Sequence, residues 1–173
     1  MSGFWDAKLF LHRGMYFDEP EYVRAPTAHY PRKALGHDLN RLKESWNRFR
    51  RDRNRDAIYV FLAEVFDLIA WWKVGNRSVR HSARMLTRRG VEMPARLEPY
   101  RAIIVAAAHP KVLDKRTVSK WSRVLRYADE CKSPNEELAA FVRRKGGLNA
   151  CAAKYGRRLK RQKARIEQTA NSI

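Results

Sequence analysis

The chain has 173 residues, with 37 lysine and arginine residues against 18 aspartate and glutamate residues, for a formal net charge of +19. Hydrophobic residues make up 45% of the chain and aromatic residues 11%, which excludes a globally disordered protein. The positive charge repels itself and favours a polyanionic partner, so nucleic acid is the expected partner and an anionic membrane surface the weaker alternative. Arginines outnumber lysines by 25 to 12, and their guanidinium groups suit contacts with phosphate and guanine.

The sequence indicates neither a secretory signal nor a membrane span. The N-terminus has no basic region followed by an apolar stretch. The most apolar run, residues 57–72, is too short for a span and carries Glu64 and Asp67 in its middle. The cysteines, Cys131 and Cys151, have no histidine at ligand spacing, so we expect reduced thiols and no metal site. We therefore predict a cytoplasmic, nucleoid-associated protein without a cofactor.

Residues 1–36 are unusually aromatic for a solvated tail. They hold seven of the nineteen aromatic residues, namely Phe4, Trp5, Phe10, Tyr16, Phe17, Tyr22 and Tyr30. Pro20, Pro26 and Pro31 interrupt the segment, so long helices are not expected there. We predict an extended arm that packs on its own domain. The alternative is an arm exchanged between the subunits of a homodimer.

Two helices are expected next. Residues 38–51 form the first, with Asp38 as N-cap and an apolar stripe of Leu39, Leu42, Trp46 and Phe49. Its arginines lie away from that stripe: Arg41, Arg48, Arg50 and Arg51. Residues 57–72 form a buried helix that is apolar nearly all round, ended by Gly75-Asn76, with Glu64 and Asp67 at its polar edge.

Residues 76–90 are predicted as a third, strongly basic helix ended by Gly90. Its inward residues are Val79, Ala83 and Leu86, and its basic residues are Arg77, Arg80, Arg84, Arg88 and Arg89. The fragment around His81 faintly resembles the His-x-x-Arg helix of tyrosine recombinases. We reject that assignment because the upstream arginine and lysine motif is missing and the spacing to Gly90 is one residue short.

Residues 114–128 are the most informative stretch for function. Asp114 is the expected N-cap of a helix whose apolar stripe is Val118, Trp121, Leu125 and Ala128. The opposite face carries Arg116, Lys120, Arg123 and Tyr127, flanked by Thr117, Ser119 and Arg126. One face therefore suits burial, and the other suits contact with phosphates and base edges.

A short apolar helix over residues 100–108 precedes this stretch, so the order is helix, break and basic amphipathic helix. The run from Thr117 to Trp121 resembles the start of helix-turn-helix recognition helices, and Ala108 falls ten residues before Val118, where that family has a small residue. The family's turn glycine would fall at Val112, and Pro110 interrupts the end of the first helix. We therefore expect a longer or differently built turn.

The C-terminal part is the most basic. Residues 133–145 are predicted as a helix, with Ser133 or Asn135 as N-cap and a Gly-Gly pair at its end. A last helix begins near Leu148. Its run from Lys154 to Arg165 holds seven basic residues and no acid. We interpret this run as a phosphate-contacting surface, and the alternative is a solvated tail.

These patterns predict an all-α protein, a compact bundle of five to seven helices with a helix-turn-helix-like unit. The domain boundaries place an aromatic arm over residues 1–36, a helical DNA-binding domain over 37–155 and a basic helix or tail over 156–173.

The predicted function is double-stranded DNA binding by a transcriptional or mobile-element accessory regulator, with duplex DNA favoured over RNA and no membrane partner. The predicted DNA-binding residues are Arg116, Thr117, Ser119, Lys120, Arg123, Arg126, Arg157, Arg158, Lys160 and Arg161. The arginine cluster of residues 77–89 is predicted to add phosphate contacts. The alternatives are a protein that binds structured RNA or the ribosome, and a protein-interaction subunit such as an anti-activator. We expect no enzymatic activity.

Overall fold

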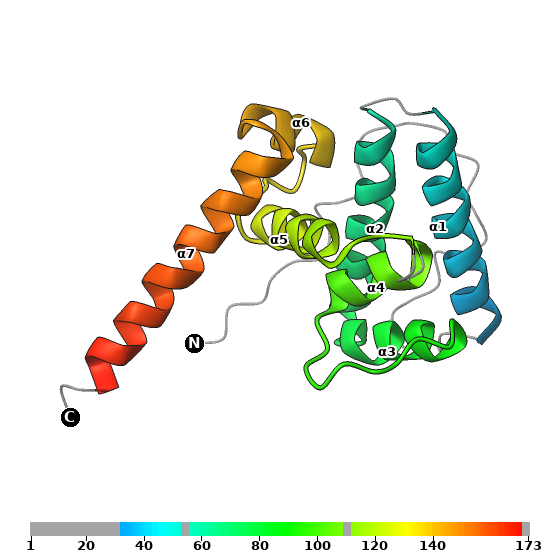
Figure 1. Ribbon diagram of the computed structural model, residues 1–173, viewed down its shortest axis with the longest axis horizontal. Helices are drawn as coiled ribbons and strands as arrows, with labels where there is room; N and C mark the ends of the chain where they lie inside the picture. The colour runs from blue at the N-terminus through cyan, green and yellow to red at the C-terminus, as the bar shows by residue number, and fades with distance from the viewer. Residues whose placement is uncertain (1–31, 53–55, 109–111, 171–173) are drawn as a thin grey trace, which may run out of the picture.

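The computed structural model describes residues 32–52, 56–108 and 112–170, and these form seven α-helices and no strand. The helices are α1 (Arg32–Asp52), α2 (Ala57–Val74), α3 (Ser78–Arg88), α4 (Pro99–Ala108), α5 (Lys115–Cys131), α6 (Leu138–Arg144) and α7 (Gly147–Ala170) (Figure 1). The prediction of an all-α bundle of five to seven helices is confirmed. Residues 1–31, on which the aromatic arm was predicted, lie outside the described residues, as does the 109–111 segment.

The central element is α2, which packs against α1, α3, α4, α5 and α6. Eight of its residues are buried, as its apolar sequence predicts: Ile58, Phe61, Leu62, Val65, Phe66, Leu68, Ile69 and Trp72. Burial of each large apolar side chain contributes about 1.5–3 kcal/mol. None of the described helices has the length and apolar character needed to cross a membrane.

An aromatic cluster joins α1, α2 and α5. The Trp121 ring of α5 lies 6.2 Å from Trp46 and 6.1 Å from Phe49, both of α1. It lies 6.2 Å from Phe61 of α2. These are edge-to-face arrangements, which are favourable beyond the area they bury. The cluster fixes α5 against the body of the protein.

Helix α1 begins earlier than predicted. It starts at Arg32, so Asp38 lies inside the helix and is not its N-cap, and residues 32–36 belong to α1 rather than to an arm. Leu35 is buried one turn before Leu39, and both continue the predicted stripe. Burial of Leu35 favours the additional helical turn over a start at Asp38.

Helix α3 buries a different face from the predicted one. Val79 is 54% exposed, so its assignment to the core is wrong. The buried residues are His81, Ser82, Met85 and Leu86. The His81 ring lies 5.1 Å from the Trp72 ring, which accounts for the rotation of the helix. Gly90 has φ +64° and ends the helix as predicted.

The turn before α6 also differs from the prediction. Helix α6 begins at Leu138, not near Ser133, because the preceding residues form a turn stabilised by side chains. Lys132 Nζ donates hydrogen bonds to the carbonyl oxygens of Ser133 (2.9 Å) and Glu136 (2.7 Å). The Glu136 carboxylate accepts two hydrogen bonds from the Arg144 guanidinium, at 2.8 and 2.7 Å. These contacts replace the first helical turn that the sequence indicated.

Candidate nucleic-acid interface

The start of α5 is fixed by its N-cap. The Asp114 carboxylate accepts hydrogen bonds from the backbone N–H groups of Arg116 and Thr117, both at 2.9 Å. The hydrogen bonds from Thr117, and then that from Arg116, lower the pKa of the Asp114 carboxyl. The cap was predicted and is confirmed. It orders the first turn, from which Arg116 projects as an exposed side chain.

The apolar face of α5 is also confirmed. Val118, Trp121, Leu125 and Ala128 are all buried, together with Ser122 and Val124. Glu98 ties this helix to α4, because its carboxylate accepts hydrogen bonds from the Tyr100 and Arg101 N–H groups and from Ser122 Oγ, the last at 2.8 Å. The two helices of the helix-turn-helix-like unit are therefore adjacent and joined by a partly buried hydrogen bond. Their connection, residues 109–114, is longer than the three or four residues of a helix-turn-helix turn.

The other face of α5 is divided along its length. In the first half, Arg116 and Arg123 are exposed, and Lys120 and Thr117 are half-buried. Arg123 Nη2 donates a hydrogen bond to Ser119 Oγ at 3.1 Å, which orients the guanidinium along the helix.

In the second half of α5, α6 and α7 cover the predicted solvent face. The Tyr127 ring lies 5.7 Å from Phe141 of α6 and is half-buried, so its assignment to the solvent face is wrong. The Arg126 guanidinium lies over the Tyr155 ring of α7, 5.0 Å from its centre. Arg126 was predicted to contact DNA, and it also holds α7 against α5.

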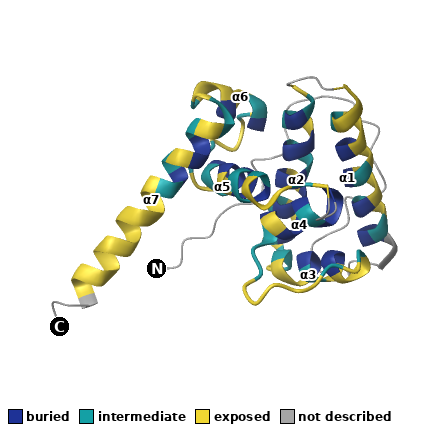
Figure 2. Ribbon diagram, viewed as in Figure 1, coloured by how far each residue is buried: buried dark blue, intermediate teal, exposed yellow. Residues whose placement is uncertain are grey.

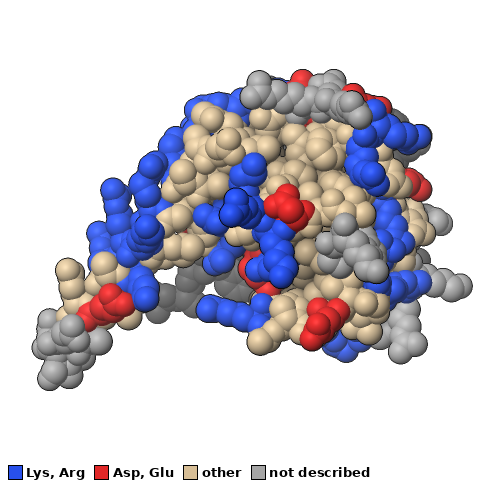
Figure 3. Space-filling view, viewed as in Figure 1, with Lys and Arg blue, Asp and Glu red and all other residues tan. Residues whose placement is uncertain are grey.

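Helix α7 crosses α5 and then leaves the body of the protein (Figure 1). Cys151, Ala152 and Tyr155 are buried, whereas every residue from 157 to 169 is exposed (Figure 2). We call residues 157–169 the outer segment of α7. Its basic residues are Arg157, Arg158, Lys160, Arg161, Lys163 and Arg165. Figure 3 shows lysine and arginine side chains gathered along this helix and over the neighbouring part of the body.

Among the predicted residues of the outer segment, Arg158 has partners within the protein. Its Nε lies 3.1 Å from a carboxylate oxygen of Glu130, and its Nη1 lies 3.2 Å from the Sγ of Cys131. Arg157, Lys160 and Arg161 are exposed. A Cβ atom built on Gly156 would lie 3.8 Å from Arg123 Nη1, so the outer segment begins beside the exposed arginine of α5. The structure therefore brings the first half of α5 and the outer segment together as one basic surface.

The arginines of α3 are not part of this surface. Helix α3 packs on α1, α2 and α4 and contacts neither α5 nor α7. Arg89 Nε donates a hydrogen bond to the carbonyl oxygen of Ala106 at 2.8 Å, and Arg88 lies against Gly36 of α1. Arg80 and Arg84 are exposed, but on this separate part of the molecule.

Three exposed basic residues adjoin the individually predicted DNA-binding residues: Lys115, which the sequence analysis missed, and Lys163 and Arg165, which belong to the predicted phosphate-contacting run. Lys115 directly follows the N-cap of α5. The other two continue the basic run that the sequence showed, and nothing buries them.

The described residues contain no group of three or more His, Cys, Asp and Glu side chains that could hold a metal ion. Comparison of the chain with protein-family models, with curated proteins and with solved structures found no match.

Proposed function

We propose that this is a double-stranded DNA-binding protein, a transcriptional or mobile-element accessory regulator. The observation that carries the proposal is the joint basic surface, in which the outer segment of α7 leaves the body beside the exposed first half of α5. A helix-turn-helix protein contacts base edges through the N-terminal residues of its recognition helix. In this protein Arg116, Lys120 and Arg123 occupy that part of α5 and would enter the major groove.

The outer segment would follow the phosphate backbone. It has no acidic residue before Glu167, and phosphate contacts by lysine and arginine release counterions from DNA. Each such contact adds roughly 0.9 to the slope of log affinity against log salt concentration. Binding is therefore expected to weaken steeply between low and moderate salt.

Fluorescence anisotropy with duplex DNA, single-stranded DNA and duplex RNA, each at two salt concentrations, tests the proposal. Wild type is expected to prefer duplex DNA. The variant with Arg116, Lys120 and Arg123 all changed to Ala is expected to lose that preference, because of the three nucleic acids only duplex DNA has a major groove that a helix can enter.

The matched control replaces three other exposed arginines by Ala, namely Arg80, Arg84 and Arg96. It removes the same charge from surfaces outside the proposed interface, so the preference for duplex DNA should survive. If wild type and the α5 variant bind all three nucleic acids alike, the recognition role of α5 is refuted. A clear preference for RNA would instead favour an RNA-binding function.

The proposal is for a binding role and not for catalysis. Incubation of end-labelled duplex with the protein and Mg²⁺ should leave the DNA intact. Cleavage, or a covalent protein–DNA product, would contradict this part of the proposal.

A further inference from the structure

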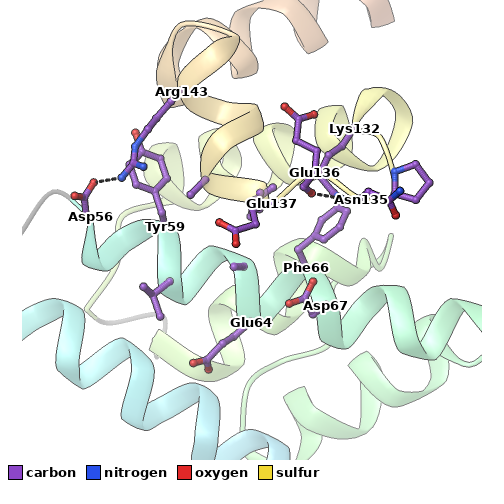
Figure 4. A pocket seen from close by; sticks show the side chains of 15 residues that line it. Asp56, Tyr59, Glu64, Phe66, Asp67, Lys132, Asn135, Glu136, Glu137 and Arg143 are labelled. Carbon is purple, nitrogen blue, oxygen red and sulfur yellow. Dashed lines mark hydrogen bonds and ion pairs between the residues drawn. The ribbon is translucent and has the colours of Figure 1, made fainter. Parts of the chain in front are cut away.

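A groove of about 590 Å³ lies between α2 and the segment that leads into α6 (Figure 4). We call it the α2–α6 groove. Its apolar lining comes from both sides and comprises Tyr59, Val60, Ala63, Phe66, Pro134, Leu138 and Ala139. Val60 is 47% exposed, so part of this lining faces solvent. The groove is large enough to accept two or three apolar side chains of a partner.

Five carboxylates line the same groove: Asp56, Glu64, Asp67, Glu136 and Glu137. Asp56 pairs with Arg143 at 2.5 Å, and Glu136 pairs with Arg144 at 2.7 Å. Within the described residues no ion pair is found for Glu64, Asp67 or Glu137.

The three carboxylates without an ion pair lie on different sides of α2 and α6. Figure 4 shows Glu137 between α6 and α2, and Glu64 on the side of α2 that faces α1. Desolvation raises the pKa of the Glu64 and Asp67 carboxyls, and it outweighs the charges of Arg41 near both and of Lys132 near Asp67, so a further positive charge would favour their ionised forms.

Two cations line the groove as well: Lys132 Nζ lies 5.5 Å from the centre of the Phe66 ring, and the Arg143 guanidinium lies 5.2 Å from that of Tyr59. With five carboxylates against two cations in its lining, the groove is negative overall, and in a protein of charge +19 it favours a basic, apolar occupant.

The chain itself supplies such an occupant. The buried stripe of α7 continues past Tyr155 as Leu159 and Ile166, which are 38% and 69% exposed. Lys163 lies between them on the same side of the helix. Helix α7 contacts α5 and α6 but not α2, and its outer segment leaves the body, so it does not reach the groove of its own chain (Figure 1).

We propose that the α2–α6 groove binds the outer segment of α7 from a second copy of this protein. Leu159 and Ile166 are seven residues apart, about 10.5 Å along a helix, and the exposed apolar residue of the groove wall is Val60 of α2. In this arrangement Lys163 faces the carboxylates of the groove. The inference is independent of the proposed DNA binding, because Arg157, Arg161 and Arg165 lie on other sides of the helix and stay exposed.

The N-terminal segment is another part of the chain that could occupy the groove, and its charge argues against it. Residues 1–31 contain four acidic and three basic residues, so they do not complement an acidic groove. The outer segment has six basic residues and one acidic residue.

Sedimentation analysis of the nuclease-treated full chain over a range of concentrations tests the proposal. Wild type is expected to self-associate, and more weakly at high salt. The groove variant, Asp67→Lys with Glu137→Lys, and the α7 variant, Lys163→Glu, should each associate more than about tenfold more weakly, because like charges then face each other. All three positions are exposed, so the variants should fold like wild type, which their thermal unfolding would check.

Mixing the two variants gives the sharper result. The normal α7 of the groove variant can bind the normal groove of the α7 variant, so association should return in the mixture. The matched control, Glu44→Lys with Glu92→Lys, reverses two exposed acidic residues outside the groove and should associate like wild type. Three results would overturn the proposal: a monomer at every concentration, association unaffected by the groove variant, or association abolished by deletion of residues 1–31 alone.

Discussion

Helices α5 and α7 are both basic and amphipathic, yet the apolar residues of α5 are buried along the helix and those of α7 only in its first part. Every large apolar residue of α5 from Val118 to Leu125 is buried, and these residues recur every three or four positions. In α7 this spacing ends at Leu159, which is already 38% exposed, and the next large apolar residue, Ile166, comes only seven residues later. The density of apolar residues, and not the charge, therefore decides how far a basic helix packs.

Because the two helices differ in burial, their basic side chains also differ in how firmly they are held. Those of α5 are held by a helix that is fixed on one side by the aromatic cluster and on the other by α7. Those of the outer segment extend from the body on a single helix. A rigid set suits the reading of base edges, and an extended set suits contacts with the phosphate backbone.

Among the substitutions that test how firmly α5 is packed, Trp121→Ala is expected to have the largest effect on stability. Trp121 is 6% exposed and contacts aromatic rings of α1 and α2, so its removal leaves a cavity where three helices meet. The free energy of unfolding should fall by about 3–5 kcal/mol, as measured by urea denaturation.

The matched control is Trp71→Ala. Trp71 is 52% exposed on α2, so its replacement should change the free energy of unfolding by no more than about 0.5 kcal/mol. Equal effects of the two substitutions would mean that α5 is not fixed by the aromatic cluster.

The sequence predicted those elements whose signals are local or periodic. The burial of α2, the apolar stripe of α5, the Asp114 cap and the Gly90 terminus were all predicted and are confirmed. Each depends on residues within one or two helical turns of one another. These features can therefore be predicted without knowledge of the tertiary structure.

The errors arose where a distant contact overrides the local signal. Val79 was expected inside, but the contact between His81 and Trp72 rotates α3 away from it. Tyr127 was expected outside, but Phe141 of α6 covers it. For the candidate site, the sequence indicated which helices are basic. It could not show that α5 and α7 lie together while α3 lies apart, because that depends on tertiary packing.

A smaller effect is expected from Glu98→Ala. The Glu98 carboxylate caps α4 and also accepts a hydrogen bond from Ser122, so it connects α5 to the helix before it. Its removal should lower the free energy of unfolding by about 1–2 kcal/mol, as measured by urea denaturation. Glu92→Ala, at an exposed position of the preceding loop, should have no such effect. An equally small effect of both would show that the link between α4 and α5 is not stabilising.

A weaker, pH-dependent effect is expected from His81 on α3. Burial, and then the charges of Arg84, Arg77 and Arg80, lower the pKa of His81 below its ordinary value of 6.5. The folded state therefore prefers the neutral imidazole. The stability this contributes is complete above pH 6.5 and is lost as the pH falls toward the lowered pKa.

Urea denaturation of wild type and His81→Gln between pH 8 and pH 5 measures this effect. Below pH 6.5 the stability of wild type should decline more steeply than that of the variant. Because only the difference in slope matters, a constant reduction of stability in the variant does not affect the result. Parallel curves would mean that the protonation of His81 is not linked to folding.

The smallest effect on stability is expected from removal of residues 160–173. None of the described side chains removed is buried, so in dilute protein the free energy of unfolding should change by no more than about 0.5 kcal/mol. The same truncation removes four basic residues of the proposed interface: Lys160, Arg161, Lys163 and Arg165. Affinity for duplex DNA should fall, and its salt dependence should become shallower by up to roughly 0.9 for each phosphate that these residues would neutralise.

A truncation after Ala150 is the control for that variant, because it also removes the buried Cys151, Ala152 and Tyr155. Removal of these residues uncovers the second half of α5 and should destabilise the protein by several kcal/mol. The contrast between the two truncations places the end of the packed core within α7. If the shorter deletion alone cost more than about 1 kcal/mol, the outer segment would itself stabilise the folded chain. Helices α5 and α7 would then both be packed along their whole length and would differ only in the surfaces that they contact.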